Sequence, residues 1–526
     1  MSITQTALAV EDTRAARATA NLPRVLILAD DLSGAADCAV TGARLGLRSH
    51  VVLHHEAATQ LSAQSDAPID VLAIDLDCRR QSPSVAAQIH TDAWRLLGHA
   101  AVRLYKKVDS TLRGNVASEV AALTAEIGMA IVAPAFPSAG RTTVGAHQLL
   151  HGTPLEETEV WRNEHIPGRA DLAQMMSSAG LRTESLTLRN VRADAQALTE
   201  QLTVLQASGI QAVVCDAETD DDLYRIARAS IGLQNVFWVG SAGLAREWLV
   251  EHEQVQKHNE KHRGQAEKQT ENQTDKHPGT SPGEASPHRP ARGVSAQESQ
   301  AQSRGHMLAQ GPVLAVVGSM SSISHAQVSA LRSEAGDAML ALEIDTQALL
   351  GDATDEMFGA RESQALLVAR ITAEVAQALD AGRDVLVSLS QKDRTRVADG
   401  LLLCEALAGL LAPVVPLAGT VIATGGETAR ALLGAAHVHS LRIVDEIEHG
   451  VPLMHAVRPV AAGVPTQKHL QVVTKAGGFG TPHTLIAAWR RASMSDACEA
   501  ALSPTFSGPT PAHGAEDRPF HEELTQ

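Results

Sequence analysis

Short apolar runs alternate along this chain with longer Ala- and Leu-rich segments of helical spacing, and this rhythm constrains the fold more than any other feature. Strands that are apolar at nearly every position are typical of parallel sheets, which helices cover on both faces. We therefore predict an α/β fold with mainly parallel or mixed sheets flanked by helices. The predicted strands are 24–29, 49–53, 69–75, 101–105, 129–134, 211–216 and 235–240, then 313–318, 339–344, 384–389, 420–424, 441–445 and 470–474.

The two groups of strands are separated by a stretch that cannot form a core. From Gln256 to Gly293 no Val, Ile, Leu, Met, Phe, Trp, Tyr or Cys occurs. Such a stretch buries too little apolar surface to offset the entropy lost on ordering. We predict two α/β lobes joined by a disordered low-complexity linker. The predicted segments are a flexible N-terminal arm (1–22), a first lobe (23–251), the linker (252–309), a second lobe (310–495) and a flexible tail (496–526).

The composition argues against several classes of partner. The chain has 60 acidic and 44 basic residues, a net charge of −16, and few aromatic side chains (5 Trp, 2 Tyr, 6 Phe). A general nucleic-acid surface needs clustered Lys and Arg and stacking aromatics. No uninterrupted apolar run approaches the roughly 20 residues that span a bilayer. We therefore expect a cytoplasmic protein that binds neither nucleic acid nor membrane; its oligomeric state is left open, a homo-oligomer included.

The five cysteines are widely spaced and never form a C-x-x-C pair. This spacing predicts reduced thiols rather than disulfides or a structural zinc site.

Two adjacent acids, Asp30 and Asp31, follow the first predicted strand. Ligands of open α/β sheets bind beyond the C-terminal ends of the strands, so this position favours chemistry. One acid can accept a hydroxyl proton or bind Mg²⁺ while the other caps the next helix, although both can be plain turn and cap residues. Arg79 follows the third strand and suits bidentate capture of a substrate carboxylate.

The fourth strand is followed by further polar residues. Lys107 can reach an anion in the same crevice, or it can form with Lys106 a charge pair that protects an edge strand. Asp109 and Ser110 suit a small polyhydroxylated ligand, but this string is also a common helix cap. Residues 133–158 show neither helical nor strand periodicity, and we expect an irregular loop that closes over the substrate.

Three junctions in the second lobe run from an apolar strand through small residues into a helix, at 318–322, 424–428 and 474–482. Glycines there let a phosphate approach backbone N–H groups, and a helix N-terminus adds partial positive charge. Together they predict a nucleotide phosphate site. Walker-type and dinucleotide-binding glycine motifs are absent, as are the H-R-D and D-F-G strings of protein kinases.

Seven motifs, in their order and spacing, resemble those of the four-carbon acid sugar kinase family. They are LADDLSGAADCA, KKVDSTLRGN, APAFPSAGRTT with HGTPLEET, VVGSMSSISHAQ, ATGGETA, EIEHGVPLM and VTKAGGFGTPHTL. The resemblance covers roughly 24–250 and 311–490. It implies an ATP-dependent kinase, a phosphotransferase with an alcohol acceptor, that acts in sugar-acid catabolism. The first lobe would be the substrate-binding domain and the second the nucleotide-binding domain, with Mg²⁺ on the phosphates.

The same resemblance implies roles for single residues. The sugar acid would contact Asp30 or Asp31, Arg79 and the segment from Lys107 through Asp109 to Ser110, with one of the two adjacent acids as the catalytic base. Mg²⁺ ligands are left open. The ATP contacts would be Ser319, Thr424, Gly425, Gly426, Glu427, Gly477, Gly478, Phe479 and Gly480.

Within the family, the DSTLRGN string is most similar to members that convert D-threonate to 4-phospho-D-threonate, with D-erythronate and 3-oxo-tetronate as alternative substrates. Two other functions fit doubly wound lobes. One is a NAD-dependent oxidoreductase acting on the same acids, and the other is a non-catalytic sugar-acid sensor. NADH-linked turnover without ATP would identify the first, and stabilisation by ligand without ADP release the second.

Overall fold

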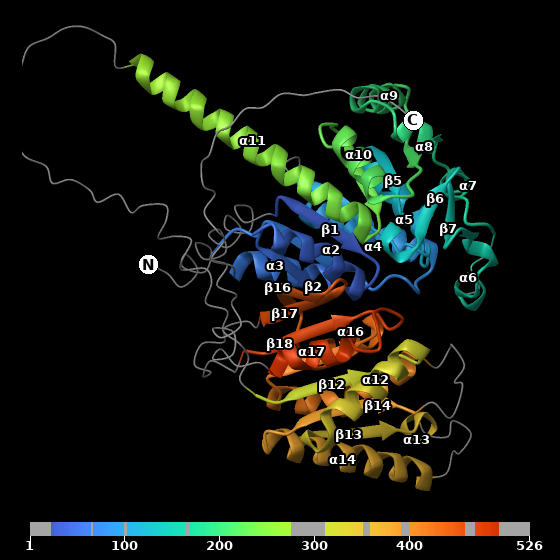
Figure 1. Cartoon of the computed structure of the whole chain (residues 1–526), viewed down its shortest axis with the longest axis vertical. Helices are drawn as coiled ribbons and strands as arrows, with labels where there is room; N and C mark the ends of the chain where they lie inside the picture. The colour runs from blue at the N-terminus through green and yellow to red at the C-terminus, as the bar shows by residue number, and fades with distance from the viewer. Residues whose placement is uncertain are drawn as a thin grey trace, which may run out of the picture.

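The computed structural model describes residues 23–64, 67–98, 102–164, 166, 168–274, 311–350, 358–390, 400–457 and 469–493. The predicted N-terminal arm and C-terminal tail lie entirely outside these residues. Within them the chain forms two α/β lobes, one above the other in Figure 1, and the prediction of a mainly parallel or mixed sheet flanked by helices is confirmed.

The N-terminal lobe is built on eight strands of the large sheet. All pairs among these eight strands are parallel, and β1 lies between β3 and β4. Every residue of β1 is buried, which explains its unbroken apolar sequence. The strands are β1 (Val25–Ala29), β2 (Ser49–Val52), β3 (Val71–Asp75), β4 (Arg103–Lys107), β5 (Met129–Ala133), β9 (Thr183–Leu186), β10 (Ala212–Cys215) and β11 (Val236–Gly240).

Helices cover both faces of this sheet. Asp31 caps α2 by accepting the Gly34 N–H, and Ser82 caps α4, which begins with Pro83. The helices are α2 (Leu32–Arg44), α3 (His55–Gln64), α4 (Pro83–Leu97), α5 (Val116–Ile127), α6 (Glu159–Asn163), α7 (Leu172–Ser178), α8 (Leu188–Val191), α9 (Ala195–Ala207), α10 (Asp220–Ser230) and α11 (Ala242–Thr274).

The C-terminal lobe continues the same sheet. Its strands β13, β14, β12, β15 and β18 are parallel, and the antiparallel hairpin of β16 and β17 follows β18. The strands are β12 (Val313–Val317), β13 (Met339–Ile344), β14 (Asp384–Leu389), β15 (Thr420–Thr424), β16 (Ser440–Glu448), β17 (Val451–Val457) and β18 (Gln471–Lys475). The helices are α12 (Ser322–Ala335), α13 (Thr346–Leu350), α14 (Phe358–Asp380), α15 (Gly400–Leu411), α16 (Gly426–Ala435) and α17 (Thr484–Ser493).

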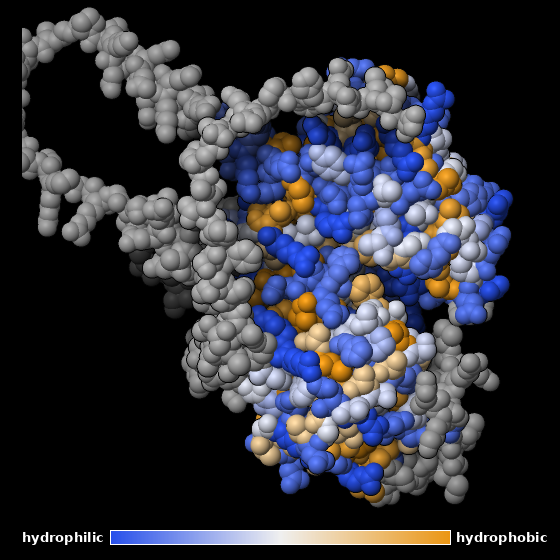
Figure 2. Space-filling model, in the orientation of Figure 1, coloured by the Kyte–Doolittle hydropathy of each residue, from blue (hydrophilic) through white to orange (hydrophobic). Residues whose placement is uncertain are grey.

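The two lobes share one sheet. Strand β16 pairs antiparallel with β2 through Ser440–Val52, Leu441–Val51 and Arg442–His50. This pairing joins the lobes into a sheet of 15 strands. The face shown in Figure 2 is mainly hydrophilic, with apolar residues scattered over both lobes.

Each of the predicted strands forms, but three expectations need correction. Strand β4 lies between β1 and β11, so Lys106 and Lys107 cannot protect an edge. Residues 133–158 are not an irregular loop, because β6 (Arg141–Val144), β7 (His147–Leu150) and β8 (Thr153–Pro154) form a small antiparallel sheet. Helix α11 continues to Thr274, into the predicted linker, and extends beyond the lobe in Figure 1. Residues 275–310 lie outside the described part of the chain.

The segment Gly400–Leu417 is apolar enough by composition to cross a membrane, with a mean hydropathy of 2.0. Within it, however, Leu403, Leu407, Leu410 and Leu411 are buried in the hydrophobic core, and α15 packs against α16. The composition is therefore that of a core helix.

Candidate active site between the lobes

A cleft of about 340 Å³ lies where the two lobes meet, at the C-terminal ends of β1, β4, β11 and β18. This is the edge at which ligands of open α/β sheets bind. The N-terminal lobe contributes most of its polar lining, and the loop after β18 with the turn between β16 and β17 contributes the rest. The charged residues that line it are Asp31, Asp37, Arg79, Lys107, Asp109, Arg113, Arg141, His449 and Lys475.

Arg79 holds the two adjacent acids in place. Its Nε and Nη2 donate to Asp30 over 2.7 and 3.0 Å, and Nη2 lies 3.1 Å from Asp31 Oδ1. Burial alone would raise the pKa of Asp30, but Arg79, Lys106 and Lys107 lower it to about 2. Asp30 is buried and does not line the cleft, whereas Asp31 and Arg79 do. The Arg79 guanidinium is therefore largely engaged by these acids.

Asp109 is held by its own turn. Its Oδ1 accepts the backbone N–H and the hydroxyl of Thr111 over 2.9 and 3.0 Å, and Arg113 pairs with its other oxygen. Burial alone would raise the pKa of Asp109, but Arg113, Arg79 and Lys107 keep it well below its usual range.

Lys107 and Ser110 also line the cleft. Among the described residues no carboxylate forms an ion pair with Lys107, so its ammonium is available to an anionic ligand. The Ser110 carbonyl accepts from the Gln148 side chain over 2.8 Å, which ties the small sheet to this segment.

The structure adds five charged residues that the sequence analysis missed: Asp37, Arg113, Arg141, His449 and Lys475. The Nε of Arg141 is buried without a hydrogen-bond partner among the described residues, and burial lowers the pKa of this guanidinium. His449 Nδ1 lies 3.5 Å from Glu446 Oε1, and this contact raises the pKa of the imidazole. Lys475 alone had a clear signal, because it directly follows a predicted strand.

The three glycine junctions of the C-terminal lobe meet at one place. A Cβ on Gly477 would lie 2.3 Å from Ser319 Oγ, and the Gly425 N–H donates to the Lys475 carbonyl over 2.8 Å. Gly425 has a φ of 99°, which lets the chain turn sharply into α16. Ser321 and Ser324 also donate to the Gly477 carbonyl. The predicted nucleotide residues are thus neighbours in space.

Lys475 is buried within this loop set. Its Nζ donates to the carbonyls of Ala476, Gly477 and Phe479 over 2.8, 3.3 and 2.9 Å. Burial lowers the pKa of Lys475 to about 8. The adjacent strand β15 ends in Thr424, whose hydroxyl is buried without a hydrogen-bond partner among the described residues.

The start of α16 touches the N-terminal lobe. A Cβ on Gly426 would lie 2.9 Å from Ser33 Oγ and 3.3 Å from Asp31 Oδ2. Next to it, Glu427 pairs with Arg80 over 2.7 Å. Residues predicted to contact the sugar acid and residues predicted to contact ATP therefore face one another.

The oxygen atoms at this contact are suitable ligands for a magnesium ion. Mg²⁺ prefers carboxylate and other hard oxygen ligands and is usually bound through one or two carboxylates plus phosphate oxygens. The Ser33 hydroxyl is buried without a hydrogen-bond partner among the described residues, and Asp31 Oδ2 lies on the same side. Asp31 and Ser33 could hold the ion.

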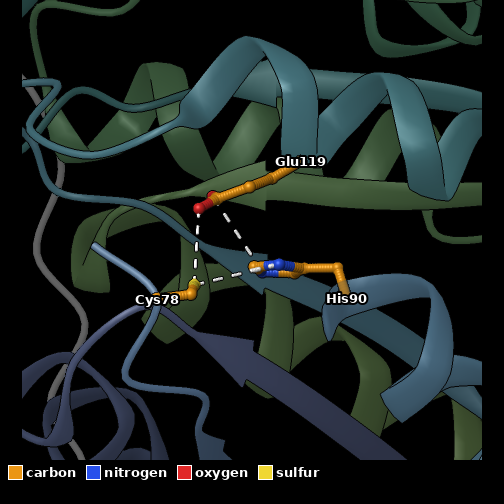
Figure 3. A group of neighbouring side chains, drawn as sticks. All are labelled: Cys78, His90 and Glu119. Atoms are coloured by element: carbon orange, nitrogen blue, oxygen red, sulfur yellow. Dashed lines mark hydrogen bonds and ion pairs between the residues drawn. The ribbon is translucent and has the colours of Figure 1, made fainter. Parts of the chain in front are cut away.

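A second cluster of potential ligands lies outside the lining of the cleft. Figure 3 shows Cys78, His90 of α4 and Glu119 of α5 pointing toward one another, with ligand atoms within 4.8 Å. However, Lys106 Nζ lies 3.0 Å from Glu119 Oε2. Burial opposes the charge of Lys106, but Glu119 and Asp30 outweigh it and raise the pKa of this ammonium. The carboxylate is already neutralised, so the cluster is a buried ion pair rather than a cation site.

Comparisons with known proteins agree with a substrate-binding N-terminal lobe and a nucleotide-binding C-terminal lobe. The family model described as a sugar-binding N-terminal domain matches residues 25–248, and a nucleotide-binding C-terminal domain matches 314–485. A D-threonate kinase from Cupriavidus necator is 40% identical over 90% of this chain and 99% of its own length. A D-threonate kinase from Bordetella bronchiseptica is 31% identical over 89% and 96%.

A solved structure of a Salmonella typhimurium protein shares the fold, with a TM-score of 0.64 at 19% identity, covering 89% of this chain and 99% of that one. The domain matches and the full-length relatives show that this chain belongs to the four-carbon acid sugar kinase family.

Proposed function

We propose that this protein is an ATP-dependent, cytoplasmic kinase that phosphorylates the terminal (4-) hydroxyl of D-threonate. The observation that carries the proposal is the meeting of the three glycine junctions with the charged cleft of the N-terminal lobe. The 40% identity to a D-threonate kinase over nearly all of that protein supports the substrate. A four-carbon acid and a nucleotide triphosphate are both anions, so their sites need placed cations and N–H groups rather than a basic surface.

In this proposal Arg141 binds the substrate carboxylate. Its buried Nε lacks a partner among the described residues, whereas Arg79 is engaged by Asp30 and Asp31. Arg79 also lines the cleft and keeps a contact with the substrate, but its main role is to position the two acids. Lys107 adds charge on the same side, and Asp109 and Ser110 face the substrate hydroxyls.

The nucleotide is held by the C-terminal lobe. Ser319, the turn from Thr424 to Glu427 and the loop from Gly477 to Gly480 surround its phosphates with N–H groups and hydroxyls, and Lys475 stiffens that loop. Asp31 and Ser33 would hold Mg²⁺, which when bound would neutralise charge on the phosphates. The protein residues mainly position the two reactants and exclude water.

ADP release measured over a panel of four-carbon acids tests the activity. We expect turnover that requires ATP and is fastest with D-threonate. D-Erythronate is the second candidate, since a D-erythronate kinase from Heliobacterium modesticaldum is 34% identical over 48% of its length. L-Threonate and the 3-oxo acids complete the panel. Equal rates across the panel would contradict the substrate assignment, and NADH-linked turnover without ATP would contradict the kinase.

The role of Arg141 has its own test. Replacing a charge-assisted carboxylate contact by an apolar chain costs about 1.5–3 kcal/mol, which corresponds to roughly 10- to 100-fold in KM. We expect Arg141→Met to raise the KM for D-threonate by that factor and to leave the KM for ATP within about twofold. Arg228→Met is the matched control, because Arg228 lies on α10 outside the cleft and contacts Tyr224. An unchanged KM for D-threonate in Arg141→Met would rule out the contact.

A further inference from the structure

Asp37 faces the cleft from helix α2. It follows Gly34 by three residues, so the two positions share one face of the helix, and both line the cleft with Lys107. A Cβ on Gly34 would lie 2.7 Å from Lys107 Nζ, so the missing side chain leaves room for the lysine beside the acid. His449, in the turn between β16 and β17, lines the same cleft from the C-terminal lobe.

The carboxylate of Asp37 has an unused acceptor. Its Oδ1 is buried and has no hydrogen-bond partner in the described part of the chain. Buried polar atoms in native proteins are nearly always paired, so an orphaned oxygen at the wall of a ligand cleft indicates a partner brought by the ligand. A substrate hydroxyl can donate to it.

The other carboxylates of the site are already engaged by hydrogen-bond donors or cations of the protein. Asp30 accepts two hydrogen bonds from Arg79, and its pKa is about 2. Asp31 Oδ1 accepts the Gly34 N–H and pairs with Arg79. Asp109 is bonded to Thr111 and Arg113 and has a strongly lowered pKa. Each of these acids therefore already accepts a hydrogen bond from the protein.

Asp37 differs from these acids in its surroundings. Burial raises its pKa, and Glu446 and Asp31 add to that shift, while Lys107 and His449 oppose it. Asp31 is the N-cap of α2, Lys107 ends β4, Glu446 lies on β16, and His449 lies in the turn that follows β16. A carboxylate with a raised pKa is the stronger base, and general-base catalysis is most effective when the pKa approaches the working pH.

We propose that Asp37, rather than Asp30 or Asp31, is the general base of the phosphoryl transfer, an inference that rests on the kinase function proposed above. The proton of the substrate hydroxyl moves to the Asp37 carboxylate as the hydroxyl oxygen bonds to the γ-phosphorus. The bond from that phosphorus to the β,γ-bridging oxygen breaks, and ADP leaves with the electron pair. Asp37 then gives the proton to water, so atoms and charge balance over one turnover.

The test compares Asp37→Asn with the wild-type protein in the ADP-release assay. We expect kcat to fall by about 10²- to 10⁴-fold, with KM values for the sugar acid and ATP within a few-fold. The fall of wild-type kcat toward acidic pH should disappear in this variant. Asp92→Asn is the matched control, because Asp92 is an acid on α4 that bonds only Gln88 among the described residues and lies outside the cleft. It should keep wild-type kcat.

A second variant distinguishes loss of the carboxylate from misfolding of the protein. Asp37→Ala should lose activity to a similar extent, and added formate should restore part of it by supplying a carboxylate in the vacated space. Thermal stabilisation by ADP checks that each variant is folded. Asp37→Asn that binds ADP and keeps more than about a tenth of wild-type kcat would overturn the role of Asp37 while leaving the kinase in place. Wild-type protein that releases no ADP with any acid of the panel would instead overturn the function.

Discussion

Arg80 of the N-terminal lobe and Glu427 of the C-terminal lobe form an ion pair, with 2.7 Å between Nη2 and Oε1. The pair lies beside the glycine turn that begins α16, where the two halves of the candidate site face one another. Both side chains are about half exposed, at 48% and 41%, so the pair adds little to the free energy of unfolding. Its position suggests an effect on how the lobes meet when nucleotide is bound.

Reversing the charge at Arg80 tests this effect. We expect Arg80→Glu to raise the KM for ATP by about fivefold, since like charges at this distance replace an attraction of at most about 1 kcal/mol, and to change the melting temperature little. The increase should shrink in high salt. Arg95→Glu is the matched control, because Arg95 pairs with Glu126 on the surface of the N-terminal lobe alone. Equal KM values for both variants would show that the contact has no role in nucleotide binding.

Replacing Arg79 should destabilise the fold as well as the site. Arg79→Met leaves the buried Asp30 without its partner, and removing one member of a buried pair typically costs about 3–5 kcal/mol. Urea unfolding at neutral pH measures this loss. Arg225→Met, which breaks an exposed i,i+4 pair with Asp221 on α10, should cost less than about 0.5 kcal/mol.

The same network predicts a pH dependence of stability. Since the pKa of Asp30 is lowered from 3.8 to about 2, its contribution is complete above pH 4 and is lost as the pH falls toward 2. The difference in unfolding free energy between wild type and Arg79→Met should therefore narrow over this acidic window. A constant difference from pH 7 to pH 3 would assign the loss to packing instead.

The lowered pKa of Lys475 predicts that nucleotide binding depends on pH. Its pKa is lowered from 10.5 to about 8, so the ammonium is charged at neutral pH and loses its proton as the pH rises through 8. We expect the KM for ATP to rise between pH 7 and pH 9.5, and Lys475→Met to show no such rise. The unfolded chain binds this proton more tightly, so the same group makes the fold more stable as the pH increases from 8 toward 10.5. A pH-independent KM would contradict the assignment.

A methyl group on Gly426 should separate the two halves of the site. In Gly426→Ala the new Cβ would lie 2.9 Å from Ser33 Oγ, closer than real contacts allow. We expect kcat/KM to fall by at least tenfold, since small displacements of the reacting groups are costly. Gly434→Ala on the same helix meets nothing within 4 Å and should keep wild-type activity, with stability raised by up to about 1 kcal/mol. Equal activities would show that the contact at Gly426 is dispensable.

The large sheet could be predicted because buried parallel strands have unbroken apolar sequences, as in 129–133 and 313–317. Strand β9, with two exposed residues among its four, has no such pattern. The β6–β8 sheet is short and polar, and it is held by contacts such as that of Gln148 with Ser110, which are distant in sequence. Helix α11 extends beyond the core, where apolar periodicity carries no signal.

The candidate site was predictable where a residue lies at the C-terminal end of a strand or just after it, as Asp31, Lys107 and Lys475 do. Asp37 lies within helix α2, and its place in the cleft depends on how the C-terminal lobe packs against that helix. Arg141 falls in the small sheet that the sequence analysis took for a loop. Most importantly, the engagement of Arg79 by Asp30 and Asp31 is a matter of side-chain geometry. The sequence identified a suitable guanidinium there, but which partner it binds requires coordinates.

The pairing of β16 with β2 has a consequence for how the two lobes can be separated and recombined. Backbone hydrogen bonds along a shared sheet hold them together, and these bonds involve no residue between 275 and 310. We expect a chain cut within that interval to give two fragments that associate through the exposed edges of β2 and β16. The two lobes thus contact one another as the subunits of a heterodimer do, although they belong to one polypeptide. Co-expression of the two halves offers a way to combine the substrate-binding lobe of one relative with the nucleotide-binding lobe of another.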